Sequence, residues 1–386
     1  MHKIIFNKRR GRMKKFLSII FLLALPFSSN AEELFIYNWS DYIAEDTIAN
    51  FEEETGIDVT YDVFDSNEVL EAKLLAGGSG YDIVVPSGSF MENQIKAGVF
   101  QKLDKSKLPN LANLDPSVLE KTDAHDPGGE YSVNYMYGTT GIGYNVAAVE
   151  ERGGDVESWD IIFNPDEISK YADCGVAMLD APSEVVEIAL NYLGYDANTE
   201  NTKANEEALE LLKQIRPYIK YFDSSQYIDD LANGEICLAV GWSGDVFIAA
   251  YEEIEEVWYS IPNEGTVIWF DMMGIPADAK NVDNAHKFID YVLRPEVVAE
   301  ITNYVWYSNP NLVANTTEGL IDPEILEDPA IYPTEETLLK LFADTADSPQ
   351  KSRISSRIFN SFKSSSINNT FMKSTTCDLQ VVLFYL

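Results

Sequence analysis

Residues 34–42 read Leu34-Phe35-Ile36-Tyr37-Asn38-Trp39-Ser40-Asp41-Tyr42. The first four are apolar or aromatic, which is typical of a short buried strand, and a polar turn with two more aromatic rings and one carboxylate follows them. Aromatic faces attract cations, and a carboxylate accepts hydrogen bonds from ammonium groups. The stretch therefore predicts either a recognition loop for an organic cation or an ordinary strand end with a solvated Asp41.

The residues that follow alternate between helical and strand patterns. Residues 46–55 and 65–77 have helical patterns, and residues 57–63 and 81–86 have strand patterns. This order is typical of βαβ units, which form a largely parallel sheet with helices on its faces. Such sheets bind ligands at the carboxyl ends of their strands. We therefore expect an α/β fold whose ligand site includes the end of the first strand.

Pairs of an indole and a carboxylate recur later in the chain. Trp242 is followed by Asp245, and Trp269 by Asp271, in each case after an apolar run; a further apolar segment closes at Trp306-Tyr307. Because each pair follows a predicted strand, chance is a poor explanation of the repetition. The pattern favours the recognition loop over the ordinary strand end for residues 39–42.

The first 31 residues have the pattern of a secretory signal peptide. A basic stretch that ends at Lys15 precedes an apolar run over 16–27, and Ser29-Asn30-Ala31 supplies small residues for cleavage. Removal of this segment, with its seven Lys and Arg and no acids, would change the formal charge from −35 to −42. So acidic a protein repels nucleic acid and attracts cations. We expect a periplasmic protein with no nucleic-acid partner.

Cys174 and Cys237 are the expected disulfide pair in an oxidising compartment, and two buried free thiols are the alternative. Cys377 lies in a tail over 365–386 that is rich in Ser, Asn and Thr before an apolar end. We predict that this tail is disordered and assign it no function.

The sequence provides poorly for catalysis and for metal binding. Its three histidines are far in sequence from any candidate nucleophile, and the stretch 241–245 has Asp245 where a nucleophile elbow would have its last glycine. No loop has EF-hand spacing, and there is no His/Cys cluster. The chain is predicted to be no enzyme and to need no cofactor or metal. A glycoside hydrolase that uses Asp245 and Asp271 is the alternative from another class.

Several motifs together resemble the periplasmic putrescine- and spermidine-binding proteins of bacterial polyamine ABC transporters. The resemblance covers about residues 32–364 and is carried by residues 37–42, 65–68, 84–87, 140–145, 241–245, 275–281 and 293–299. It implies a type II periplasmic binding fold, in which two αβ lobes enclose a ligand cleft. It further implies that lobe 1 comprises 32–138 and 271–315, and that lobe 2 comprises 139–270 and 316–364.

The resemblance also implies a set of ligand-binding residues. The aromatic residues of this set would enclose the methylene chain of a polyamine, the acids would pair with its ammonium groups, and two hydroxyls would assist. The set is Trp39, Tyr42, Trp242, Trp269 and Tyr307, then Asp41, Glu184, Asp245 and Asp271, then Ser40 and Ser87. Buried ammonium groups need such acceptors because an unpaired buried charge is very costly.

Two positions bear on which polyamine is bound. Spermidine-type relatives carry an additional acid where this chain has Ala181, whereas Trp269 matches the spermidine type. We expect putrescine first and spermidine second. The expected partners are the permease subunits of an ABC transporter, and the protein is expected to be a monomer. A sensor of polyamines that signals to a membrane receptor is a further alternative.

Overall fold

The computed structural model describes residues 32–252 and 256–365. The predicted leader over 1–31 and most of the tail over 365–386 lie outside the described residues. The strands are β1 (Glu32–Trp39), β2 (Ile57–Phe64), β3 (Ile83–Val84), β4 (Ser132–Asn145), β5 (Val176–Met178), β6 (Ile219–Phe222), β7 (Leu238–Trp242), β8 (Val257–Ser260), β9 (Val267–Gly274) and β10 (Phe342–Ala343).

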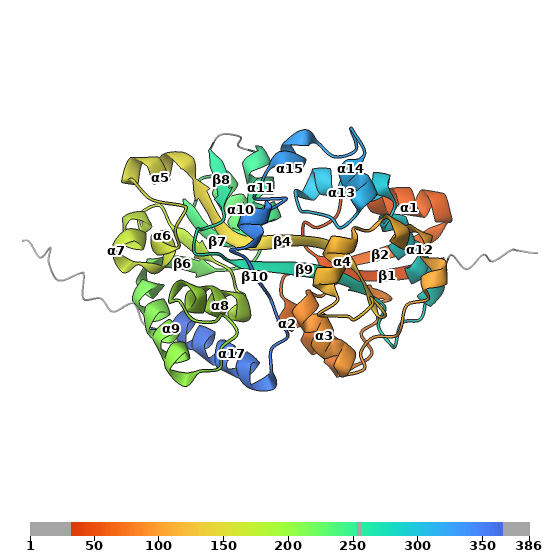
Figure 1. The fold of residues 1–386 in the computed structure, drawn as a ribbon, viewed down its shortest axis with the longest axis horizontal. Coiled ribbons are helices and arrows are strands. Elements are labelled where there is room, and N and C mark those ends of the chain that lie inside the picture. Colours follow the sequence, from red (N-terminus) through yellow and green to blue (C-terminus); the bar gives the residue numbers. More distant parts are fainter. Residues whose placement is uncertain (1–31, 253–255, 366–386) are drawn as a thin grey trace, which may run out of the picture. The chain divides into compact units, whose positions relative to one another are not determined.

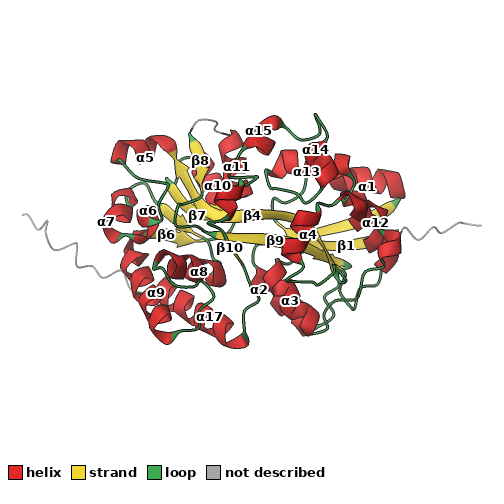
Figure 2. Ribbon diagram, in the orientation of Figure 1, coloured by secondary structure: helices red, strands yellow, loops and turns green. Residues whose placement is uncertain are grey.

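The helices lie on both faces of the sheet that these strands form (Figures 1 and 2). Their bounds are α1 (Thr47–Thr55), α2 (Asn67–Ala76), α3 (Gly88–Lys96), α4 (Pro116–Thr122), α5 (Val146–Arg152), α6 (Asp160–Phe163), α7 (Pro165–Ile168), α8 (Pro182–Tyr192), α9 (Thr202–Ile215), α10 (Gln226–Ala232), α11 (Ser243–Glu252), α12 (Val282–Val292), α13 (Pro295–Val305), α14 (Leu312–Thr316), α15 (Pro323–Glu327), α16 (Glu335–Leu338) and α17 (Pro349–Ser364).

The sheet has the strand order β2-β1-β3-β9-β4-β7-β5-β6, with β10 beside β9 and β8 beside β4. Strand β1 pairs in parallel with β2 and β3, and β5 pairs in parallel with β6 and β7. The expectation of a largely parallel sheet is thus met in its two outer parts. It is wrong in the middle, where β4 runs antiparallel to β7, β8 and β9.

Strand β4 connects the two outer parts because its two ends pair with different neighbours. Residues 132–139 pair with β9, whereas residues 140–144 pair with β7. A strand of 14 residues can serve both parts without a turn, and the switch occurs at Thr139-Thr140. The sheet therefore has two αβ halves joined by β4 and β9; the exact lobe boundaries given above stay a prediction.

The local sequence explains the burial of β1, the end of α1 and the start of α2. Strand β1 is buried at Leu34 and from Ile36 to Trp39, mostly apolar or aromatic residues, and Gly56 ends α1 in the left-handed backbone region with φ of 71°. The Ser66 hydroxyl caps α2 by accepting a hydrogen bond from the backbone N–H of Val69.

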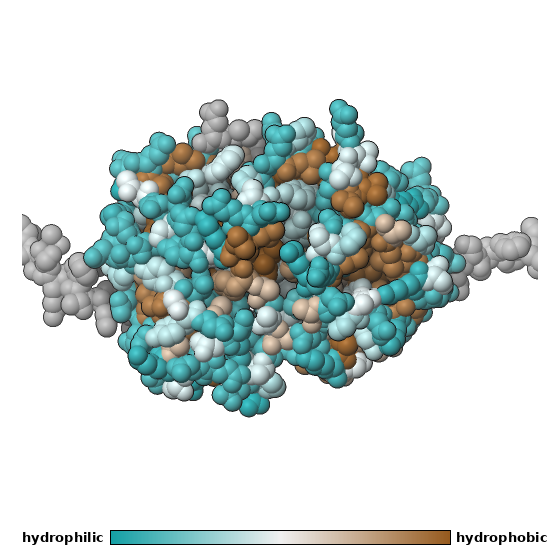
Figure 3. All heavy atoms as spheres, viewed as in Figure 1, coloured by the Kyte–Doolittle hydropathy of each residue, from teal (hydrophilic) through white to brown (hydrophobic). Residues whose placement is uncertain are grey.

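On the face drawn in Figure 3, hydrophilic residues surround a few hydrophobic patches.

The predicted disulfide between Cys174 and Cys237 is present and closes 63 residues of chain. Cys237 directly precedes β7, and Cys174 lies two residues before β5, which pairs in parallel with β7. The bond therefore fastens the starts of two adjacent strands in the second half.

Replacing both cysteines with serine is expected to lower the free energy of unfolding by about 4 kcal/mol, because the open chain gains loop entropy when unfolded. Urea denaturation followed by circular dichroism measures this difference. A loss below about 1 kcal/mol would show that the cross-link does not restrict the unfolded chain as this account assumes.

No helix in the described part of the chain is long and apolar enough to cross a bilayer.

Candidate functional site

A cavity lies where β1 and β7 end and the helices α3, α8 and α11 begin, beside the middle of β9. The expectation that Trp269 and Asp271 follow a strand is wrong, because β9 continues past them to Gly274. The space between its lining side chains, including its opening to solvent, is about 380 Å³. Ten of the eleven residues expected in the ligand set line it, namely Trp39, Ser40, Tyr42, Ser87, Glu184, Trp242, Asp245, Trp269, Asp271 and Tyr307.

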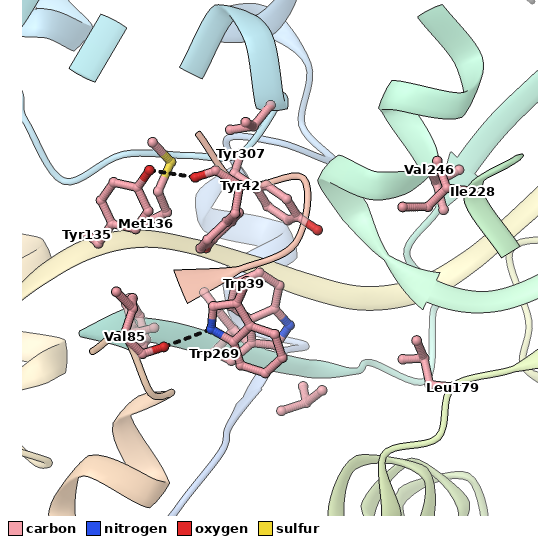
Figure 4. Close-up of a cluster of buried hydrophobic side chains, with 14 of the residues drawn as sticks. Trp39, Tyr42, Val85, Tyr135, Met136, Leu179, Ile228, Val246, Trp269 and Tyr307 are labelled. Atoms are coloured by element: carbon pink, nitrogen blue, oxygen red, sulfur yellow. Dashed lines mark hydrogen bonds between the residues drawn. The ribbon is translucent and has the colours of Figure 1, made fainter. Parts of the chain in front are cut away.

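Aromatic rings form most of the wall. Trp39 and Trp242 meet edge to face with their ring centroids 5.4 Å apart, and Tyr307 lies 5.0 Å from Tyr42 and 5.5 Å from Trp269. Figure 4 shows Trp39, Tyr42, Trp269 and Tyr307 gathered around one space. The indole N–H of Trp39 donates to the carbonyl of Val85 at 2.8 Å, which fixes the ring. The faces of these rings can sheath an alkyl chain and attract a cation.

Asp271 is held by two hydroxyls that come from distant parts of the chain. Ser87 donates to its Oδ1 at 2.7 Å, and Tyr42 donates to its Oδ2 at 2.8 Å. Ser87 in turn accepts a hydrogen bond from the side-chain amide of Asn67 at 2.9 Å. Each carboxylate oxygen keeps a second lone pair, so Asp271 can still accept hydrogen bonds from a ligand.

Asp245 has the same arrangement in the second half. Tyr307 donates to its Oδ1 at 2.7 Å and Tyr227 donates to its Oδ2 at 2.8 Å. The acid lies in the first turn of α11, where the positive end of the helix dipole favours a negative charge. The phenol hydroxyls of Tyr307 and Tyr227 thus fix the orientation of the Asp245 carboxylate.

Glu184 is the third acid of the cavity and begins α8. Its Oε2 accepts hydrogen bonds from the Thr140 hydroxyl at 2.6 Å and from the Trp242 indole at 3.1 Å. Thr140 also accepts a hydrogen bond from the Trp269 indole at 3.2 Å. This acid and two indoles of the wall therefore share one hydrogen-bond network.

The three acids share one electrostatic property. Burial raises the pKa of Asp245, of Asp271 and of Glu184 to about 7 in each case, although the hydroxyl and indole donors described above lower it. No Lys or Arg of the described residues forms an ion pair with any of the three. The cavity therefore has negative charge to offer and no internal cation to balance it.

Asp41 is the one residue of the expected set that does not line the cavity. Its side chain is exposed, and its backbone lies in the left-handed region with φ of 52°. Burial raises its pKa, and so does the nearby Asp229. Its neighbours Ser40 and Tyr42 line the cavity, and its charge raises the pKa of Asp245, so its place in the ligand set stays a prediction.

Sequence reasoning missed residues that support these acids. Thr140 and Tyr227 donate hydrogen bonds to Glu184 and Asp245, but nothing in their local pattern marks them. Asp344 follows the short apolar run Leu341-Phe342-Ala343, but the strand formed there has only two residues, so the pattern is too weak to mark it. No group of three or more His, Cys, Asp or Glu in the described part of the chain could hold a metal ion.

Comparison with known proteins agrees with this geometry. The family described as bacterial extracellular solute-binding protein matches residues 46–333. The chain is 51% identical over 357 residues to the putrescine-binding periplasmic protein PotF of Escherichia coli, covering 89% of this chain and 95% of that one. It is 50% identical to the putrescine-binding periplasmic protein SpuD of Pseudomonas aeruginosa, covering 86% and 93%.

A solved structure gives the same result for the fold. The putative spermidine/putrescine ABC transporter protein from Listeria monocytogenes superposes with a TM-score of 0.79 at 34% identity, covering 87% of this chain and all of that one. The predicted α/β fold with two lobes is thereby confirmed.

Proposed function

Since this chain belongs to the bacterial extracellular solute-binding protein family, we propose that its cavity captures putrescine and that the protein delivers the amine to an ABC permease. The observation that carries the proposal is the placement of three carboxylates and five aromatic rings around one small space with no internal cation. The diamine would place its ammonium groups among Asp245, Asp271 and Glu184 and its methylenes against the rings.

The protein is a binding protein and not an enzyme, as its relatives are. A glycoside hydrolase that uses Asp245 and Asp271 is not favoured, because the relatives of this chain are binding proteins. We further propose export to the periplasm through the leader over 1–31, a monomeric state, and a role in transport rather than in sensing.

Ligand size bounds the affinity. Putrescine has roughly six non-hydrogen atoms, and about 1.5 kcal/mol for each is the ceiling for small ligands. The binding free energy is therefore at most about 9 kcal/mol, which corresponds to a dissociation constant near micromolar or somewhat tighter.

Calorimetric titration with putrescine and spermidine at equal ionic strength tests the proposal. We expect both amines to bind, putrescine more tightly, because Ala181 leaves no additional acid for a third amine. Spermidine binding about tenfold tighter would reverse the ranking. No binding of either amine, or turnover of oligosaccharides without any amine-induced rise of the melting temperature, would overturn the function.

Amine affinity is expected to fall as the pH is lowered from 8 to 6. Because burial raises the pKa of the three acids to about 7 in the unliganded protein, they hold protons below that pH and must release them to pair with ammonium groups. The loss should be on the order of tenfold for each carboxyl that must ionise. Alkylamines stay charged over this range, since their pKa is near that of lysine.

The same linkage predicts the sign of the stability change. The pKa of each acid is higher in the folded than in the unfolded chain, so the unliganded protein loses stability as the pH rises through about 7. Putrescine should therefore raise the melting temperature more at pH 8 than at pH 6. Equal affinities and equal shifts at the two pH values would contradict the assignment of these acids to the amine.

A further inference from the structure

A fourth acid, Asp344, lies next to the cavity without lining it. It follows β10, which pairs in parallel with β9 through Phe342 opposite Val267 and Ala343 opposite Ile268. The backbone N–H of Asp344 donates to the carbonyl of Ile268 at 3.2 Å. Ile268 directly precedes Trp269, so Asp344 lies beside the strand that carries both Trp269 and Asp271 into the site.

Two serines at the start of α3 each donate a hydrogen bond to a different acid. Ser87 donates its hydroxyl to Asp271, and Ser89, two residues further on, donates its hydroxyl to Asp344. Asp271 lines the cavity and Asp344 does not. One short segment of backbone therefore holds an acid of the site and the acid behind it in fixed positions.

Asp344 has no cation of its own. The nearby Lys351 of α17 forms its ion pairs with Glu187 and Asp347, and among the described residues no ion pair includes Asp344. The hydroxyl of Ser89 is the one side-chain hydrogen-bond donor that it has in the described part of the chain. Its charge is therefore offset by the Ser89 hydroxyl and, without an ion pair, by the nearby Lys351.

The charged groups around Asp344 come from several elements. Lys351 and Asp347 approach from α17 and the segment before it, Glu68 from α2, and the acids Glu184 and Glu187 from α8. Burial raises the pKa of Asp344 to about 6, and its charge raises the pKa of both Asp271 and Glu184. Asp344 thus acts electrostatically on two of the three acids of the cavity, one in each half of the fold.

We propose that Asp344 is a specificity-determining residue of the amine site. Its negative charge, held by Ser89 beside β9, favours amines with three positive charges over amines with two, although it does not touch the ligand. A charge that acts through low-dielectric protein stabilises each cation in proportion to that cation's charge and proximity. Asp344 therefore partly offsets the absence of an additional acid at Ala181. This inference rests on the proposed amine binding.

The test compares putrescine and spermidine in the full chain by calorimetry at pH 8, with Asp344→Asn and with Glu206→Gln as the matched control. Glu206 is exposed on α9 and carries the same charge. We expect Asp344→Asn to weaken spermidine about tenfold and putrescine about threefold, and Glu206→Gln to change neither by more than about twofold. Equal weakening of the two amines, or no weakening, overturns the inference.

Two further measurements separate an electrostatic role from a structural one. In Asp344→Asn the pH at which putrescine affinity is half lost should move down, because Asp271 and Glu184 ionise more easily without the neighbouring charge. If that variant does not fold, Ser89→Ala replaces it, because loss of the Ser89 hydroxyl favours the protonated form of Asp344. The affinity for spermidine should then fall selectively near pH 6 and not at pH 9. An unchanged pH profile or an unselective effect overturns the inference.

Failure of the inference differs from failure of the proposed function. If the unaltered protein binds neither amine, both fall. If it binds them and Asp344→Asn leaves their ratio of affinities unchanged, the amine site stands and Asp344 has no part in its specificity.

Discussion

Asp271→Asn is expected to weaken putrescine binding by about 3 kcal/mol, or roughly a hundredfold, because it leaves one ammonium buried without its ionic partner. The substitution keeps the shape of the side chain, so the hydroxyls of Ser87 and Tyr42 can still contact it. Calorimetric titration at pH 8, where the carboxyl of the unaltered protein is ionised, measures the loss.

Glu206→Gln is the control for this change. Glu206 is exposed on α9 and does not line the cavity, so screened electrostatics should limit its effect to less than about 1 kcal/mol. The unliganded Asp271→Asn protein should melt no lower than the unaltered protein at pH 8, because burial penalises the charged form of Asp271 in the folded state. A loss of affinity within threefold of that of Glu206→Gln would remove Asp271 from the site.

Gly244→Ala is expected to disrupt the site by displacing the ring of Tyr307. A Cβ atom added at Gly244 would lie 2.3 Å from Cε2 and 2.4 Å from Cδ2 of Tyr307. The Tyr307 ring is buried against Tyr42 and Trp269 and cannot move aside without breaking its hydrogen bond to Asp245. Alanine is the better helix former by roughly 0.5–1 kcal/mol. The clash between the added Cβ and the Tyr307 ring should lower the free energy of unfolding by about 1–3 kcal/mol, which exceeds the gain in helix propensity.

We therefore expect Gly244→Ala to lower the melting temperature and to weaken putrescine at least tenfold, measured by calorimetry and by thermal unfolding. Tyr307→Phe is the matched variant, because it removes the hydroxyl and keeps the ring. It should cost only about 1 kcal/mol of binding, since Tyr227 still holds Asp245. Unaltered binding by Gly244→Ala would show that Tyr307 can shift without consequence for the ligand.

Much of the site could be predicted because its residues follow a local rule. Trp39 and Trp242 are the last residues of β1 and β7, and in an α/β fold such strand ends converge, whereas Asp271 lies inside β9 and reaches the site from the middle of its strand. The family resemblance added Glu184, which no strand pattern marks, and gave a role to Tyr307, which closes an apolar segment. Asp344 follows a strand end, but its strand β10 has two residues and gives too weak a pattern to be recognised.

The direction of the central strands could not be predicted in this way. Strands β4 and β9 read as ordinary apolar segments, and nothing local to them states that β4 pairs with β9 at one end and with β7 at the other. Pairing of this kind depends on contacts between residues far apart in the sequence, such as Gly138 opposite Trp269. The expectation of a largely parallel sheet failed for that reason.

The sequence by itself determined the α/β class and the kinds of side chain at the strand ends, because periodicity and spacing are local properties of the chain. The disulfide pair was predicted from the few cysteines of a chain expected in an oxidising compartment. The tertiary structure decided which of those side chains meet. Tyr42 reaches Asp271 across 229 positions of sequence, whereas Asp41, its immediate neighbour, stays outside the cavity. Asp41 has a positive φ of 52°, and which of the side chains in residues 34–42 meets a partner depends on segments far away in the sequence.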